Sequence, residues 1–253
     1  MIRTKTFQWL ALPVLVCFIN FNIVHAQSKT FTVTDFNEVI VSPHISATFK
    51  KGDKESITVE NITIAMDKFK TEMEGKTLRV YLEGAKVITK SEKYENENWK
   101  GNRSIYNGTI AKVVITYKDL TKLSLRGEET FTSEGLLKAD QFTLNVYGAS
   151  QIYFDEVDID RLKSAIYGES YIKIKKGTVN EQKFTAYGES KINTLDVANK
   201  ATKITCYGEG SFQLNVEEDL KVTAYGEATV AYKGDPDVRK GIVLGEATIE
   251  KIR

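Results

Sequence analysis

A short motif centred on Gly-Glu recurs through the second half of the chain, and it limits the folds that this sequence can adopt. Its clearest copies are the Tyr-Gly-Glu-Ser tetrapeptides at residues 167–170 and 187–190. Seven versions occur, and their glycines are 21, 20, 20, 20, 18 and 19 residues apart. These glycines are Gly127, Gly148, Gly168, Gly188, Gly208, Gly226 and Gly245. Self-similarity at a steady period of this length is typical of a stacked repeat architecture.

Aligning the repeats on the glycine shows which positions are apolar. Two residues before each glycine, the side chains are apolar or small: Leu125, Val146, Ile166, Ala186, Cys206, Ala224 and Val243. Four residues after each glycine, they are Phe131, Ile152, Ile172, Ile192, Phe212, Val230 and Ile249. The apolar positions alternate with polar ones, which is the period of a β-strand with one buried face. No repeat has a helical period.

Each repeat is therefore expected to contain a strand, a Gly-Glu turn, a second strand and a return segment. One such unit cannot bury its apolar face alone, so copies must stack, with equivalent positions forming ladders. The sequence predicts an all-β, parallel β-solenoid with coils of about 20 residues, whose strands lie roughly 4.8 Å apart along the axis. At the corners, glycine permits a positive φ or a close approach to the next coil. Cys206 stands in an inward ladder and is expected to be a core residue and not a reactive thiol.

Strand alternation places the residue before each glycine on the outer face. Five of these residues are tyrosines that should form one column: Tyr147, Tyr167, Tyr187, Tyr207 and Tyr225. The residue after the glycine gives a glutamate column that includes Glu169, Glu189, Glu209 and Glu227. Aromatic faces flanked by hydrogen-bonding groups would suit sugar rings or the apolar edge of a partner, but a tyrosine ladder also stabilises a solenoid by itself. The glutamates must be solvated, bonded to corner amides or neutralised by cations, and they could also contact sugar hydroxyls.

The first 26 residues have the pattern of a cleaved signal peptide. Arg3 and Lys5 precede an apolar run at residues 9–19, and Val24-His25-Ala26 provides a cleavage site before Gln27. An uncleaved anchor is the alternative. We expect export to the periplasm, the outer surface or the medium, with residues 27–253 as a single domain. Cleavage lowers Lys+Arg from 35 to 33 against 34 Asp+Glu, so the mature chain has a formal charge of about −1.

Composition and hydropathy exclude several classes of protein. The chain is 42% hydrophobic and 27% charged, which is typical of a globular protein. A net charge near zero argues against nucleic acid as a partner. No later apolar run is long enough for a transmembrane helix. The repeat coils are clear over residues 119–251, whereas the N-terminal half contains less regular strands, a hairpin at residues 70–82 and a long loop or hairpin insertion at residues 90–108.

Residues able to support catalysis or metal binding are few. The mature chain retains one histidine, His44, which is expected at a solvent-facing strand end. We find no Ser-His-Asp set and no Cys/His metal spacing, so no cofactor is expected. Residues 155–160 (Asp-Glu-Val-Asp-Ile-Asp) form the densest acidic stretch. They could bind Ca²⁺, or they could be a solvated outer edge with Val157 and Ile159 turned inward.

Several N-terminal motifs give the chain a family resemblance. They are Phe36-Asn37-Glu38-Val39, the stretch at residues 41–49, Gly52-Asp53, Ile57-Thr58-Val59-Glu60, Thr77-Leu78-Arg79-Val80 and residues 113–117. Together with the glycine repeats, they resemble the putative auto-transporter adhesin head GIN domain family over nearly all of residues 31–250. The resemblance implies an exported protein, commonly from Bacteroidota-type bacteria, with a right-handed parallel β-helical fold. It brings no catalytic signature.

Two kinds of function fit these features. The first is a non-catalytic, adhesin-like binding module of the cell envelope, whose repeat surface contacts a glycan or a cell-surface protein. The second is a structural envelope protein that associates with itself, because a solenoid exposes unpaired edges at its ends. A polysaccharide lyase-like enzyme is a distant third. The sequence names no ligand.

Overall fold

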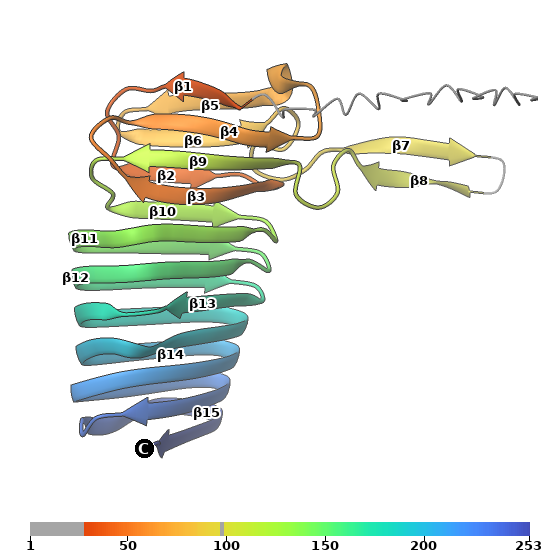
Figure 1. Cartoon of the computed structure of the whole chain (residues 1–253). Coiled ribbons are helices and arrows are strands. Elements are labelled where there is room, and N and C mark those ends of the chain that lie inside the picture. Colours follow the sequence, from red (N-terminus) through yellow and green to blue (C-terminus); the bar gives the residue numbers. More distant parts are fainter. Residues whose placement is uncertain (1–27, 97–98) are drawn as a thin grey trace, which may run out of the picture.

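The computed structural model describes residues 28–96 and 99–253, which wind into an elongated stack of β-strands (Figure 1). The predicted signal peptide lies outside the described residues. The described chain is an all-β solenoid of about six turns with less regular N-terminal strands, which confirms the predicted fold class.

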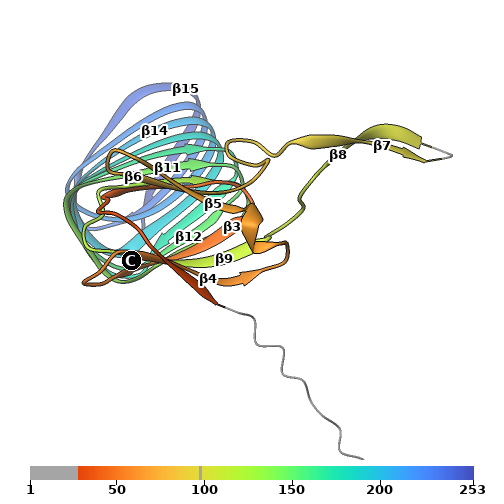
Figure 2. The ribbon, with the colours of Figure 1, turned by 90° about the horizontal axis from the view of Figure 1, so that it is seen from above.

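The regular part of the solenoid contains long strands that continue around the corners. They are β10 (Lys122–Arg126), β11 (Thr130–Tyr147), β12 (Gln151–Tyr167), β13 (Ser170–Ile174), β14 (Gly177–Lys233) and β15 (Asp237–Lys251). β14 alone has 57 residues because its ladder bonding persists through successive coils. Seen from above, these coils superimpose around one enclosed core (Figure 2).

Equivalent residues of neighbouring coils pair in parallel register. Tyr147 pairs with Tyr167, and Tyr167 pairs with Tyr187. The inward positions one residue earlier stack in the same way, and Ile166 and Ala186 are fully buried. In the last coil, Val243 and Ile249 are only partly buried. This follows from the position of β15, which pairs only with β14 among the described strands.

The N-terminal strands extend the stack and then cover its end. They are β1 (Lys29–Thr32), β2 (Glu38–Val41), β3 (Ile45–Lys51), β4 (Ser56–Ile62), β5 (Phe69–Glu74), β6 (Thr77–Leu82) and β9 (Ala111–Tyr117), with a short 3₁₀ helix, η1 (Met66–Lys68). β2 pairs in parallel with β10 and β6, and β3 pairs in parallel with β11 and β9. The pairs β1–β4, β4–β9 and β5–β6 are antiparallel. The antiparallel strands close this end of the core, whereas β15 at the other end has an open edge (Figure 1).

Two turns in the N-terminal half differ in their setting. The turn at residues 74–76 joins β5 to β6 within the main sheet. Within the insertion at residues 90–108, β7 (Ser91–Asn96) and β8 (Trp99–Ser104) form a separate two-stranded sheet. This hairpin projects sideways from the stack (Figures 1 and 2).

Candidate functional site

One outer wall of the solenoid carries the predicted tyrosine column. We call it the ladder face: the outward side chains of the coil segments that end at Tyr147, Tyr167, Tyr187, Tyr207 and Tyr225. Tyr167, Tyr187 and Tyr207 are 42%, 37% and 38% exposed, and the two outer tyrosines are half-buried. The wall is formed by parallel strands in register, so equivalent side chains recur at the inter-strand spacing.

The five tyrosine rings stack face to face along the solenoid axis. Successive ring centroids, from Tyr147 to Tyr225, lie 5.1, 4.7, 4.7 and 4.9 Å apart, and the planes of neighbouring rings differ by no more than 5°. The guanidinium carbon of Arg126 lies 4.6 Å from the Tyr147 ring centroid and covers that end of the ladder. Leu244 pairs with Tyr225 at the other end.

This stacking changes what the tyrosines can offer a ligand. Each of Tyr167, Tyr187 and Tyr207 has a neighbouring ring against both of its faces. The expected contact between a free ring face and a sugar ring is therefore not available to these three residues. They present ring edges and phenolic hydroxyl groups, and a hydroxyl group both donates and accepts hydrogen bonds.

The corner glycines define the edge of the ladder face. All seven have positive φ values, between 103° and 136°. At Gly148, a Cβ atom would lie only 2.1 Å from the carbonyl oxygen of Gly127 in the preceding coil. The hydroxyl group of Ser170 donates to the Gly148 carbonyl oxygen at 3.0 Å, so buried serines also hold neighbouring corners together. Glycine is required here by both the backbone conformation and the close approach of the next coil.

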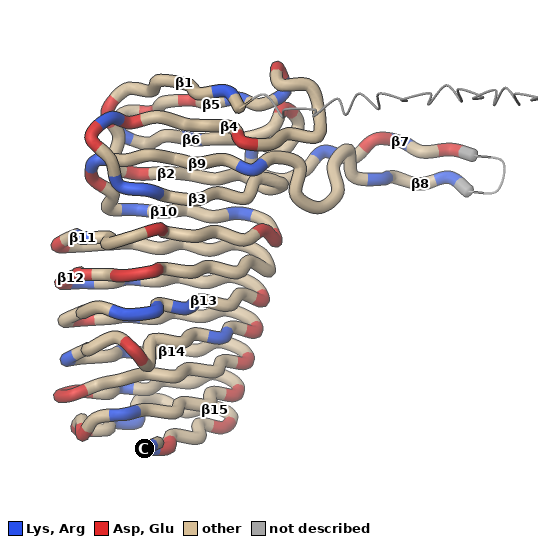
Figure 3. The backbone as a smooth tube through the Cα atoms, viewed as in Figure 1, with Lys and Arg blue, Asp and Glu red and all other residues tan. Residues whose placement is uncertain are grey.

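The four predicted glutamates lie just beyond the corner and point into solvent. Glu169, Glu189, Glu209 and Glu227 are all exposed. Within the described residues, none of them forms an ion pair. Acidic residues at one corner of successive coils are visible in Figure 3. Of the three outcomes expected for this column, the structure therefore fits solvation.

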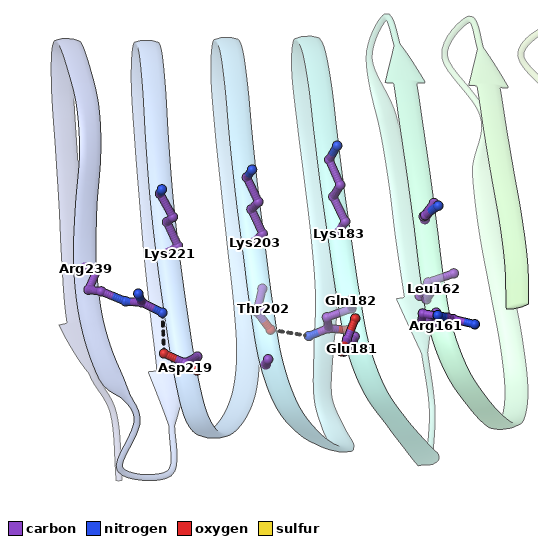
Figure 4. Close-up of a pocket in the computed structure, with 12 residues that line it drawn as sticks. Arg161, Leu162, Glu181, Gln182, Lys183, Thr202, Lys203, Asp219, Lys221 and Arg239 are labelled. Atoms are coloured by element: carbon purple, nitrogen blue, oxygen red, sulfur yellow. Dashed lines mark hydrogen bonds and ion pairs between the residues drawn. The ribbon is translucent and has the colours of Figure 1, made fainter. Parts of the chain in front are cut away.

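Sequence reasoning missed a second column on the ladder face. It contains Lys163, Lys183, Lys203 and Lys221, each five residues before a corner glycine, and we call it the lysine column. Figure 4 shows the last three projecting side by side from consecutive coils. The glycine-aligned repeats contain this signal as a lysine at the same position of four successive coils. Between the two columns lie the smaller residues Ala165, Thr185, Thr205 and Thr223.

The acidic stretch at residues 155–160 is paired with basic side chains of adjacent coils. Asp155 bonds to Lys175 at 2.6 Å, and Asp158 bonds to Lys138 at 2.7 Å. The hydrogen bond from Lys175 holds the pKa of Asp155 below its ordinary value. Val157 and Ile159 are turned inward and buried, as the second of the two interpretations expected. Among the described residues no group of His, Cys, Asp and Glu has the arrangement of a metal site.

His44 is not the solvent-facing residue that we expected. It is half-buried, has a positive φ of 69°, and its Nδ1 and Nε2 atoms each lie 2.7 Å from an oxygen, the Gly108 carbonyl and the Thr89 hydroxyl group. Its backbone N–H donates to Glu129, whose carboxylate is buried in the first corner. The Nδ1 atom of His44 lies 4.0 Å from Glu129 Oε1, and it hydrogen-bonds to the Gly108 carbonyl oxygen instead. His44 thus joins two loops to the first coil and does not form a nucleophile-activating pair with Glu129.

Burial also decides the character of Cys206. Burial raises the pKa of the Cys206 thiol, and Cys206 is fully inaccessible. It is a core residue in the structure, which agrees with its place in an apolar ladder. In the part of the chain that the structure describes, no helix has the length and the apolar character needed to cross a membrane.

The fold and the ladder face define the class of the protein: a β-solenoid whose outer wall repeats one set of polar side chains along the axis. The family model described as "Putative auto-transporter adhesin, head GIN domain" matches residues 35–236, and the chain belongs to this family. No curated protein matches the sequence.

Several solved structures share the fold at low sequence identity. A putative adhesin from Parabacteroides merdae is 21% identical, with a TM-score of 0.65, over 90% of this chain and 96% of that one. A putative adhesin from Bacteroides fragilis is 17% identical, with a TM-score of 0.72, over 89% and 96% of the two chains. A structure described as a putative lipid binding protein from Parabacteroides distasonis is 20% identical, with a TM-score of 0.62, over 90% and 96%. At these identities, the likeness establishes the fold.

Proposed function

We propose that this protein is an exported, non-catalytic adhesin of the bacterial cell envelope that binds a glycan or a protein surface through the ladder face. The observation that carries the proposal is the stacked column of five tyrosines, whose hydroxyl groups and ring edges repeat along a straight, partly exposed line. Aromatic residues with a polar end are favoured at binding surfaces because they combine apolar area with hydrogen bonding. The adhesin family supports the same role.

Export is part of this proposal and rests on the sequence. Residues 1–26 have the three-part signal peptide pattern, and adhesin function requires that the protein reach the envelope. The proposed locations are the periplasm, the outer surface and the medium. The proposed partners are a glycan or a cell-surface protein, with no cofactor and no nucleic acid.

A matched pair of tryptophan variants tests whether the ladder face is the binding surface. Thr205 and Ser211 are both half-buried, outward residues of one coil, on opposite sides of the Gly208 corner. Fluorescently labelled protein beginning at Gln27 is applied to a glycan array and to bacterial and host cells. We expect Thr205→Trp to lose binding and Ser211→Trp to retain it. Absence of wild-type binding to every surface, or equal loss in both variants, overturns the proposal.

Self-association is a second candidate function, and the open edge of β15 favours it. Ile242 and Leu244 on this strand are 60% and 65% exposed, and an unpaired strand edge can pair with another chain. Light scattering after size-exclusion chromatography should then show dimers whose fraction rises with concentration. The Ile242→Lys/Leu244→Lys variant should be monomeric. A wild-type protein that remains monomeric at high concentration excludes this candidate.

A further inference from the structure

We propose that the lysine column binds a linear acidic polysaccharide that lies along the solenoid axis. This inference rests on the proposed function, since it assigns a ligand class to the ladder face. The column was defined above as Lys163, Lys183, Lys203 and Lys221, and all four side chains are exposed.

The first observation is that these four lysines have no acidic partner among residues 28–96 and 99–253. Within the described residues, no ion pair or hydrogen bond of their ammonium groups is found, whereas Lys138, Lys175 and Lys176 each pair with a carboxylate one coil away. Lys163 pairs directly with Lys183 in the strand register. Like charges at directly opposed positions of neighbouring strands repel one another. A row of uncompensated cations at this spacing is stabilised when an anionic chain lies over it.

The second observation is a hollow beside the column. It has a volume of about 330 Å³ (Figure 4). Ala201, which lines it, is a small uncharged residue at the position that is acidic in the two adjacent coils, Glu181 in one and Asp219 in the other. Six basic residues and two acidic ones line it, and Asp219 is already bonded to Arg239. The hollow therefore has a net positive charge and room for groups that project from a bound chain.

The third observation concerns the shape of the ligand. The lysine column crosses the strands, so its charges repeat at the inter-strand spacing in a straight line parallel to the tyrosine ladder. A linear polymer with regularly spaced carboxylates or sulfates matches such a row. The threonine hydroxyls between the columns and the tyrosine hydroxyls beyond them can bond to sugar hydroxyls.

The same geometry disfavours nucleic acid as the occupant. Proteins that bind single strands stack the bases on aromatic side chains, and the central tyrosines have both faces covered by their neighbours.

Polygalacturonate is a suitable probe. Its fully methyl-esterified form is the neutral control, and poly(dT) is the control polyanion, whose sugars lack adjacent free hydroxyl groups. Binding is measured by biolayer interferometry with the chain beginning at Gln27, at several salt concentrations. We expect wild-type protein to bind polygalacturonate, with affinity that falls as salt rises. The Lys183→Gln/Lys203→Gln variant should lose about tenfold in affinity and part of the salt dependence.

The control variant is Lys173→Gln/Lys191→Gln, which removes the same charge from the wall beyond the corner and should bind within about twofold of wild type. Equal binding of the methyl ester, equal competition by poly(dT), or equal losses in both double variants overturns the lysine column as a site for acidic polysaccharide. If wild-type protein binds no acidic polymer but binds other surfaces in a way that Thr205→Trp abolishes, this inference fails and the proposed function stands. Absence of all binding removes both.

Discussion

The rings of Tyr167 and Tyr187 lie face to face, with centroids 4.7 Å apart and planes only 3° from parallel. The two residues are also register partners in neighbouring coils. The separation of the rings therefore equals the spacing of the strands that carry them, and neither ring needs to tilt to reach the other. The ladder thus stabilises the stack of coils in addition to its proposed role as a binding surface.

Replacing one central tyrosine should separate these two roles. Tyr187→Ala removes the stacking contacts with Tyr167 and Tyr207 and should destabilise the protein by about 1–3 kcal/mol, because each aromatic pair contributes about 0.5–1.5 kcal/mol. Tyr187→Phe keeps the stack and should retain wild-type stability while it loses one hydroxyl group. Urea unfolding of the three proteins checks the order. Equal stability of the alanine and phenylalanine variants would contradict a structural role for the ladder.

Two glycines with positive φ offer a test of the corner geometry. Gly148→Ala should cost about 3 kcal/mol or more, because backbone strain is added to a Cβ that meets the Gly127 carbonyl oxygen at 2.1 Å. Gly135 has a φ of 72° but nothing within 4 Å of the added Cβ, so Gly135→Ala should cost only about 1–2 kcal/mol. Thermal unfolding of both variants gives the comparison. Losses of the same size would show that close approach between coils is not what requires glycine at the corner.

The sequence predicted the features that repeat and missed those that depend on distant partners. A ladder such as Val146 and Ile166 could be identified because every coil repeats the same alternation of apolar and polar residues. The environment of His44 could not be predicted, since its backbone partner Glu129 is 85 residues away and belongs to another coil. The antiparallel pairing of β1 with β4 and of β4 with β9 has the same cause: it occurs once, so no periodicity indicates it. The β5–β6 hairpin was predicted, because its turn at residues 74–76 is a local signal. On the ladder face, the column of tyrosines was predicted with two alternatives, free ring faces for a ligand or a self-stabilising ladder, and the ring distances decide for the ladder.

Glu129 should make a pH-dependent contribution to stability that is opposite in sign to that of the surface carboxylates. Burial raises the pKa of Glu129, although the N–H groups of Glu128 and His44 and the His44 ring partly offset this effect. A carboxyl group whose pKa is higher in the folded state stabilises the protein below its unfolded pKa, and this contribution is lost as the pH rises through the folded pKa.

The comparison of wild type with Glu129→Gln isolates this contribution from the rest of the titration. Between the ordinary pKa of a glutamate and neutral pH, the unfolding free energy of wild type relative to the variant should fall, by about 1.4 kcal/mol for each unit of pKa difference. Urea unfolding at a series of pH values measures the difference. A difference that is constant, or that grows in favour of wild type as the pH rises, would rule out a raised pKa. Asp155 and Asp158 have lowered pKa values, so their contributions to stability change with pH in the opposite direction. These contributions are the same in wild type and variant, and they cancel in the difference.

A polar pair inside the core gives the last prediction. Gln182 and Thr202 are both buried, and Gln182 Nε2 donates to Thr202 Oγ1 at 2.9 Å, but within the described residues Gln182 Oε1 has no partner. The preceding coil has Leu162 at the position of Gln182. Gln182→Leu removes the unpaired oxygen and leaves the Thr202 hydroxyl group donating to Asn199, so it should stabilise the protein by up to about 1 kcal/mol. Thr202→Val instead leaves both Gln182 and Asn199 without this partner and should destabilise it by about 1–3 kcal/mol. Thermal unfolding distinguishes the two variants, and a loss of stability in Gln182→Leu would mean that the unpaired oxygen carries no cost in this core.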